Sequence, residues 1–276
     1  MARIEYNLYR VKMIQPLQVS LFSTKATPEE LLLDALKERP SMELRENYIW
    51  HVGNITMLTP YRGYLAIGRT TLTTLAKYDN RSGNFVDEPG ETSPYTHVVF
   101  DSSIGVLAIS KKLLLAPTTK GIASALARLL QSTQIVIKNE IDVEIGIIPD
   151  PKGFLQRVHS AYAVKKFTAT FTGPNPFDAD EYFQKPLSIY AKAADAAGGK
   201  ATISGEGLNK EVVEEVAKST AATGNKASAR IQDHRGKRCV TVNMSGDPVK
   251  MVYEEDSHDI AAVAEDMVEE YNRVRR

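Results

Sequence analysis

Two prolines and a glycine fall within five residues near the middle of the chain, in the segment Pro149-Asp150-Pro151-Lys152-Gly153. Such a segment can neither continue a strand nor start a helix at once, so it is typical of a junction between domains. We therefore expect an N-terminal domain over residues 1–150 and a C-terminal domain over residues 151–276. A chain of this length can bury enough of its surface that its core needs neither a metal nor a disulfide.

The N-terminal half contains several strand patterns. Residues Arg3 to Ile14 alternate, with Ile4, Tyr6 and Leu8 on one face, which predicts a half-buried strand. Tyr48 to Leu58 and Tyr64 to Thr70 flank a turn-forming segment and predict a hairpin. Three further strands are expected at Tyr95–Phe100, Ile104–Ser110 and Gln134–Ile148. The polar stretch from Asp79 to Pro94, rich in Gly, Pro, Ser and Asn, is expected to be a mobile loop.

Helix starts are also visible in this half. The Thr27 hydroxyl can accept from the Glu30 N–H while the Glu30 carboxylate reaches back, and Pro28 fits the first helical position. This helix should end before Pro40. A second helix is expected within Leu114–Leu130, capped by Thr118 or Thr119.

The C-terminal half is mixed as well. Phenylalanine and alanine alternate with threonine over Phe167–Thr172, which predicts a strand, and a helix is expected from Pro186 to Gly198. The remaining elements are a strand at Lys200–Ser204, a helix at Asn209–Thr220, a hairpin of Lys226–Gln232 with Lys237–Met244, and an amphipathic helix at Asp259–Val274. The chain is therefore expected to have an α+β fold, with two mixed domains built on antiparallel sheets with packed helices.

Charge and composition limit the classes of function. The 34 basic residues balance the 34 acidic ones, but 14 basic and 9 acidic residues lie between Lys152 and Arg238, so an anion site would be local to that stretch. Cys239 is the only cysteine, which favours a reducing compartment. No apolar run approaches the roughly 18 residues that cross a bilayer, so a cytoplasmic protein is expected.

Signatures of enzymes are missing from the sequence. It has no GxxxxGK[ST], GxSxG or HExxH motif, and no two histidines have the spacing of metal ligands. We therefore expect a protein that is not an enzyme and holds no cofactor and no metal. One alternative is a metal-dependent nuclease in which Glu140, Asp142 and Glu144 share a strand face and bind a cation. The other is a protein-interaction module whose final helix docks on a partner.

The hairpin near residue 230 is the sharpest candidate for a binding site. Alternation places Lys226, Ser228, Arg230 and Gln232 on one face of its first strand, and turn residues follow from Asp233 to Gly236. Residues i and i+2 of a strand lie about 6.5 to 7 Å apart, close to the spacing of phosphates along a nucleic-acid strand. An equally open interpretation is that edge strands carry Lys and Arg to discourage aggregation.

Several short segments, in order along nearly the whole chain, resemble the RexA family of phage exclusion proteins. The resemblance rests on these residues: Asn47-Tyr48-Ile49-Trp50, Gly63-Tyr64-Leu65, Ile104-Gly105, Ala116-Pro117-Thr118-Thr119, the threonine-rich strand Phe167–Thr172, Ala229-Arg230-Ile231-Gln232-Asp233 with Gly236, and the helix Ile260–Arg273.

The resemblance implies a function in abortive infection, or superinfection exclusion. It implies a two-domain homodimer that binds double-stranded DNA without strong sequence preference and works with a membrane ion channel resembling RexB. Family DNA contacts carry over to Arg230, while a second family lysine falls on Gln232. The charge missing at Gln232 can be replaced by Arg235, Lys237 and Arg238, and Lys226 adds another. The expected nucleic-acid-binding residues are therefore Lys226, Arg230, Gln232, Arg235, Lys237 and Arg238.

Overall fold

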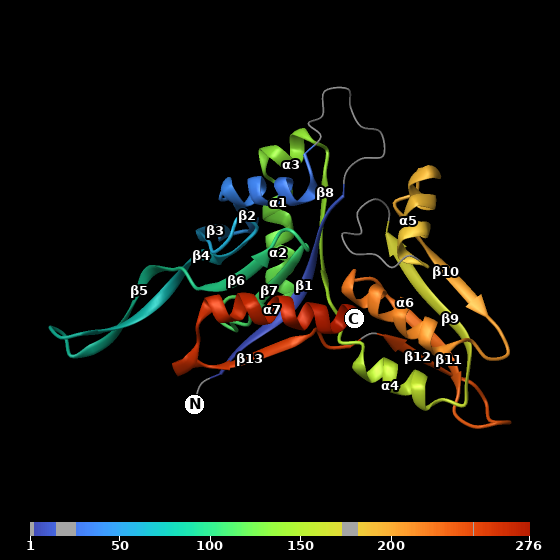
Figure 1. Ribbon diagram of the computed structural model, residues 1–276. Helices are drawn as coiled ribbons and strands as arrows, with labels where there is room; N and C mark the ends of the chain where they lie inside the picture. The colour runs from blue at the N-terminus through green and yellow to red at the C-terminus, as the bar shows by residue number, and fades with distance from the viewer. Residues whose placement is uncertain (1–2, 15–25, 173–181, 245) are drawn as a thin grey trace.

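The computed structural model describes residues 3–14, 26–172, 182–244 and 246–276. Within these ranges the chain forms seven α-helices and two antiparallel sheets, one of nine strands and one of four, which confirms the predicted α+β fold (Figure 1). The helices are α1 (Pro28–Lys37), α2 (Thr119–Gln131), α3 (Gln134–Lys138), α4 (Lys152–Ser160), α5 (Gln184–Ala193), α6 (Lys210–Ala222) and α7 (Ile260–Arg275).

The nine-stranded sheet follows the order β13-β1-β7-β6-β4-β3-β2, with β8 paired to β1 and β5 paired to β4. Its strands are β1 (Arg3–Ile14), β2 (Ser41–Arg45), β3 (Tyr48–Met57), β4 (Arg62–Asp79), β5 (Asn84–Thr92), β6 (Tyr95–Asp101), β7 (Val106–Ser110), β8 (Asp142–Ile147) and β13 (Lys250–Glu254).

Strand β1 lies at the centre of the molecule. The prediction that it is half-buried was wrong, because α1 and α2 pack on one side of the large sheet and α7 packs on the other. Both faces of β1 are therefore covered, and even Asn7, Arg10 and Lys12 are buried. Polar residues within a strand do not reveal its exposed face when each finds a partner inside the protein.

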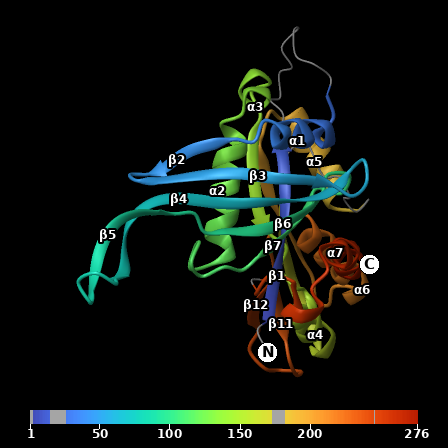
Figure 2. The ribbon, with the colours of Figure 1, turned by 90° about the vertical axis from the view of Figure 1, so that its left-hand side faces the viewer.

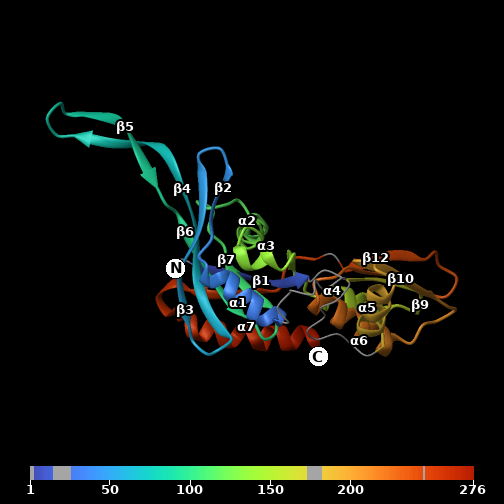
Figure 3. The same ribbon diagram turned by 90° about the horizontal axis from the view of Figure 1, so that it is seen from above.

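The four-stranded sheet has the order β10-β9-β11-β12. It contains β9 (Ala163–Thr172), β10 (Gly198–Ser204), β11 (Ala227–Gln232) and β12 (Val240–Met244). Helices α4, α5 and α6 pack against one of its faces (Figure 3). On that face Phe167, Ala169 and Ala229 are buried.

The two sheets share a hydrophobic core. One cluster of buried side chains includes Tyr6 and Leu8 of β1, Phe167 of β9, and apolar residues of α6 and α7. Strand β13 pairs with β1 of the large sheet, with Tyr6 opposite Met251. The division at residue 150 stays a prediction, and the structure adds that the chain returns to the large sheet after β12.

Most of the expected helix and strand starts are confirmed. Thr27 and Glu30 form the reciprocal cap of α1, Thr118 caps α2, and Asn209 caps α6. The β3–β4 and β11–β12 pairs are antiparallel hairpins, as predicted.

The prediction of a mobile loop from Asp79 to Pro94 was wrong. Strand β5 pairs with β4 from Thr71 opposite Thr92 to Asp79 opposite Asn84. The two strands form a long arm that projects from the body (Figure 2). Both faces of this arm are largely exposed, so its sequence shows no apolar alternation that would indicate a strand. Asp79 closes the arm by accepting from the N–H groups of Arg81 and Ser82.

Two further predictions were wrong. The segment Gln134–Ile148 is not one strand, because residues 134–138 form α3 and Glu140 has a left-handed backbone, with φ of 52°, before β8 begins. The segment Pro149–Gly153 does start a helix, since Pro151 is the N-cap of α4 and Lys152 is its first residue. Proline is compatible with the first turn because the N–H it lacks would be unused there.

Candidate nucleic-acid interface

The second face of the four-stranded sheet is not covered by any helix of the described part of the chain. Alternation along β11 buries Ala227, Ala229 and Ile231 against the helices, and leaves Lys226 and Arg230 exposed on the other side. The predicted division of this strand into an apolar face and a basic face is therefore confirmed.

Pairing between strands brings two further cations to the same face. Lys166 of β9 lies directly opposite Arg230, and Lys200 of β10 lies opposite Thr170, which in turn is bonded to Lys226. Directly paired residues share a face of a sheet. We call this surface the cationic face; it consists of Lys166, Lys200, Lys226 and Arg230 with the polar residues Thr168, Thr170, Thr202, Ser228, Thr241 and Asn243 between them.

The spacing of the cations follows from sheet geometry. Lys226 and Arg230 are four residues apart, which corresponds to about 13 Å along the strand, with Ser228 between them. Arg230 and Lys166 lie on neighbouring strands, about 5 Å apart at the backbone. The charges therefore form two rows across the sheet, separated by a row of hydroxyl and amide groups, and not the single line that the sequence suggested.

No carboxylate neutralises these charges in the part of the chain that the structure describes. Lys166, Lys200, Lys226 and Arg230 form no ion pair there, whereas neighbouring Lys165 is paired with Glu206 at 3.0 Å. A β-bulge distinguishes Lys165 from Lys166. Arg230 pairs with Lys166 and Ile231 pairs with Val164, so Lys165 lies between the two pairs without a partner residue in the register of β11. Four unpaired cations on one face repel each other, so an anion that binds them relieves this repulsion.

Hydrogen bonds fix the backbone beneath the cations. The Lys226 N–H donates to Thr170 Oγ1 at 2.9 Å, and the Thr170 N–H donates to the Lys226 carbonyl at 2.8 Å. The hydroxyl groups of Thr168 and Thr202 are 3.0 Å apart. The surface is thus a rigid sheet from which only the long Lys and Arg side chains need to move.

The other predicted site residues lie at or beyond the end of β11. Gln232 donates from Nε2 to the Lys237 carbonyl at 2.8 Å, so its amide stabilises the hairpin connection. Arg235, Lys237 and Arg238 are exposed in this connection, and Asp233 is 3.9 Å from Arg157 of α4. These three cations lie next to the cationic face but not on the sheet itself.

Sequence reasoning missed Lys166 and Lys200. A signal for Lys166 was present, because it has the same parity as Thr168 and Thr170 in the alternating strand. No such signal marks Lys200, because only the pairing of β10 with β9 places it beside the others.

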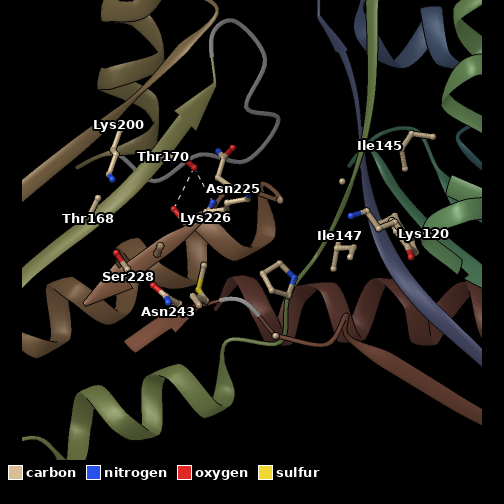
Figure 4. Close-up of a pocket in the computed structure, with 17 residues that line it drawn as sticks. Lys120, Ile145, Ile147, Thr168, Thr170, Lys200, Asn225, Lys226, Ser228 and Asn243 are labelled. Carbon is tan, nitrogen blue, oxygen red and sulfur yellow. Dashed lines mark hydrogen bonds between the residues drawn. The ribbon is translucent and has the colours of Figure 1, made fainter. Parts of the chain in front are cut away.

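The cationic face continues into a cleft of about 640 Å³. Lys200, Thr168, Thr170, Lys226, Ser228 and Asn243 form one wall, and Ile145, Ile147 and Lys120 lie across from them (Figure 4). Lys120 belongs to the first turn of α2 and adds a fifth cation. The wall formed by the small sheet therefore suits phosphate groups, and across from it Ile145 and Ile147 offer an apolar surface to a sugar or a base, with Lys120 beside them.

Two buried cations lie behind this region on β1. Arg10 donates from Nη1 to the Tyr271 hydroxyl of α7 at 2.9 Å. Lys12 donates to Thr172 Oγ1 and Asn225 Oδ1, each at 3.3 Å, and so connects the large sheet with the small one. Burial lowers the pKa of Lys12 to about 8, and this effect outweighs the attraction of Glu144, which raises the pKa; nearby Arg10 lowers it further.

This pKa predicts a pH dependence of stability. Below pH 8 Lys12 is protonated in both states, and the folded protein bears the full cost of the buried charge. Between about pH 8 and the ordinary value of 10.5 the folded protein has released the proton while the unfolded chain still binds it, so the free energy of unfolding rises. Urea unfolding of the native protein and of Lys12→Met should show a stability difference that changes by on the order of 1–3 kcal/mol across this window. A difference that does not vary with pH would contradict the buried charge.

The acidic residues proposed for a nuclease do not converge. Glu140 precedes β8 and lies outside it, which contradicts the expected shared strand face, while Asp142 and Glu144 are exposed and lie opposite Ile14 and Lys12. Among the residues that the structure describes, no group of three His, Cys, Asp or Glu side chains is arranged to hold a metal ion.

Comparisons with known proteins add no assignment: no family model matches the chain, and no curated protein matches it either. None of the helices in the described ranges combines the length and the apolar character needed to span a membrane.

Proposed function

We propose that the protein binds double-stranded DNA through the cationic face without reading its base sequence. The observation that carries the proposal is the gathering of Lys166, Lys200, Lys226 and Arg230 on one uncovered sheet face, with no carboxylate among the residues paired in register with them. A rigid, uniformly positive surface contacts the phosphate backbone, which carries no sequence information.

The energy of such binding comes from the release of counterions. Each phosphate neutralised by a Lys or Arg side chain sets ions free, so affinity falls steeply as salt is added. Arg235, Lys237 and Arg238, exposed beyond the end of β11, extend the positive field along the duplex. Two faces brought together in a homodimer would double the number of contacts.

The biological role that we propose follows from the resemblance to the RexA family. In this proposal the protein is a cytoplasmic, non-enzymatic sensor in phage defence, and binding of DNA that arises during infection changes its conformation. The change is passed to a membrane effector of the ion-channel type. The shared core between the two sheets offers a route for it, because a shift of the small sheet alters the packing of α6 and α7.

Neither alternative has the same support. The nuclease hypothesis needs carboxylates that converge, and Glu140 lies off the strand that carries Asp142 and Glu144. The interaction-module hypothesis needs the apolar face of the last helix, and Val263, Met267 and Val274 of α7 are fully buried within the protein's own core.

A salt titration tests the proposal. Binding of fluorescent duplexes of unrelated sequence should be equally tight, and the logarithm of the affinity should fall with the logarithm of salt concentration with a slope of about −3 to −4 for each protomer bound. Sedimentation of the same samples gives the number of protomers. Absence of binding at low salt, or affinity that does not respond to salt, would overturn the proposal.

A further inference from the structure

The loop between β7 and α2 exposes two leucines side by side. Leu113 and Leu114 have 70% and 73% of their surface in solvent, and Lys111 and Lys112 before them are exposed as well. The loop is a closed turn, because the N–H groups of Leu115 and Ala116 both donate to the Lys112 carbonyl, and Leu115 is fully buried. The fold therefore holds the two leucines outward, where water disfavours them.

An arginine cluster borders this loop. A cavity of about 320 Å³ between β2, β3, β4 and α2 is lined by Arg45, Arg69 and Arg128, together with Leu115 and Ala116 of the leucine loop. The guanidinium carbons of Arg45 and Arg69 lie 5.5 and 4.8 Å from the centre of the Tyr48 ring. No carboxylate belongs to the described lining, and none of the three arginines forms an ion pair in the described part of the chain.

Hydrogen bonds connect the cluster with the leucine loop. Arg69 donates from Nη2 to the Leu114 carbonyl at 3.2 Å, and its buried Nε has no partner in the described residues. Arg128 donates from Nη1 to the Leu44 carbonyl at 3.4 Å. Glu43, the one carboxylate of β2, accepts from the Asn47 N–H at 2.8 Å and forms no ion pair in the described part of the chain. Planar guanidinium groups held in this way are suited to the oxygens of a phosphate.

We propose that this loop and this cavity form a docking surface for a bilayer that contains anionic lipid. Leu113 and Leu114 enter the boundary between headgroups and acyl chains, Lys111 and Lys112 meet the negative surface, and the arginine cavity receives a headgroup phosphate. A soluble phosphate compound would bind in the cavity but would make no use of the leucines. A nucleic-acid backbone would be attracted by the arginines, but it would gain no binding energy from two exposed apolar side chains. The pairing of an apolar tip with a phosphate site therefore favours the bilayer.

This surface is separate from the cationic face, although the first turn of α2 lies between them. Lys120 lines the cleft beside the cationic face, and Gly121 lines the arginine cavity. The inference does not depend on DNA binding, and variants can separate the two.

Trp50 makes the cavity directly observable. It is the only tryptophan in the chain and it lines the cavity. We expect its emission to change when vesicles of phosphatidylglycerol and phosphatidylcholine are added, and to stay constant with vesicles of phosphatidylcholine alone. Flotation with the same vesicles gives the bound fraction. A saturating change with inorganic phosphate alone, equal to that with vesicles, would assign the cavity to a soluble ligand and overturn the proposal.

Exposed residues allow matched variants. Leu113→Asp with Leu114→Asp should weaken binding to anionic vesicles at least tenfold, and Arg45→Gln with Arg128→Gln should remove the preference for anionic lipid. The control, Leu72→Asp with Phe85→Asp on the β4–β5 arm, alters side chains that are 71% and 81% exposed and should bind vesicles as the native protein does.

Several results would overturn the proposal. One is a native protein that does not bind anionic vesicles, and another is a leucine variant that binds them normally. A third is an arginine variant that loses affinity for duplex DNA but keeps its vesicle binding. A fourth is a leucine variant with a lower mass in solution than the native protein, which would make the loop an interface between copies of the chain. The variant Lys226→Glu with Arg230→Glu changes the cationic face and should bind anionic vesicles as the native protein does. This expectation is independent of whether the protein binds DNA.

Discussion

Reversing the charge of Lys226 and Arg230 together should weaken duplex binding at least a hundredfold near physiological salt. Both side chains are exposed and form no ion pair in the described structure, so their replacement by glutamate leaves the fold intact. Each lost contact removes the release of counterions from one phosphate, and each new carboxylate repels another. In a salt titration followed by fluorescence anisotropy the slope should fall by about two units.

A second pair of variants separates the sheet face from the hairpin. Lys166 and Lys200 are far from the hairpin in sequence, but strand pairing places them on the same face as Lys226 and Arg230. Changing both to glutamate should lower the affinity for duplex DNA about as much as the first pair of substitutions does. Replacing Arg235, Lys237 and Arg238 by alanine should have a smaller effect, because these residues lie beyond the end of the strand.

The control carries the same change of net charge on other surfaces. Lys138→Glu with Lys192→Glu alters exposed lysines of α3 and α5, and it should leave duplex affinity within a few-fold of the native value. If this control weakens binding as much as the Lys226–Arg230 variant does, the effect is one of net charge, and the cationic face is not the binding surface.

The largest loss of stability is expected for Tyr271→Ala. Tyr271 is 1% exposed and belongs to the core that joins the two sheets, and its hydroxyl accepts from Arg10. Removal of a buried aromatic ring typically lowers the free energy of unfolding by about 3–5 kcal/mol, because apolar burial is lost and a cavity remains. Urea unfolding followed by circular dichroism measures the change.

Tyr271→Phe isolates the hydrogen bond from the ring. It keeps the packing but removes the acceptor for Arg10, so we expect a loss of about 1–3 kcal/mol. The phenylalanine variant should still bind DNA, since Tyr271 is not part of the cationic face. A loss below about 1 kcal/mol for the alanine variant would mean that α7 contributes little to the shared core.

Local patterns were sufficient for most elements of the fold. The reciprocal cap of Thr27 and Glu30, the hairpin from Tyr48 to Thr70 and the alternation over Phe167–Thr172 each depend on residues close in sequence, and each was predicted correctly. The β4–β5 arm was missed because it has no buried face, and α3 was missed because its three consecutive apolar residues, 135–137, also fit a strand.

The sequence alone determined the α+β class, the two faces of β11 and the presence of Lys226 and Arg230 on the exposed one, since these follow from the twofold period of a strand. Only the tertiary structure decided that β9 and β10 bring Lys166 and Lys200 to the same face, that β1 is buried on both sides, and that an arginine cavity lies beside two exposed leucines. The physical reason is that alternation fixes which way a side chain points within its own strand, whereas its neighbours across the sheet depend on which strands pair and in which register, and these pairings are set by packing over the whole core.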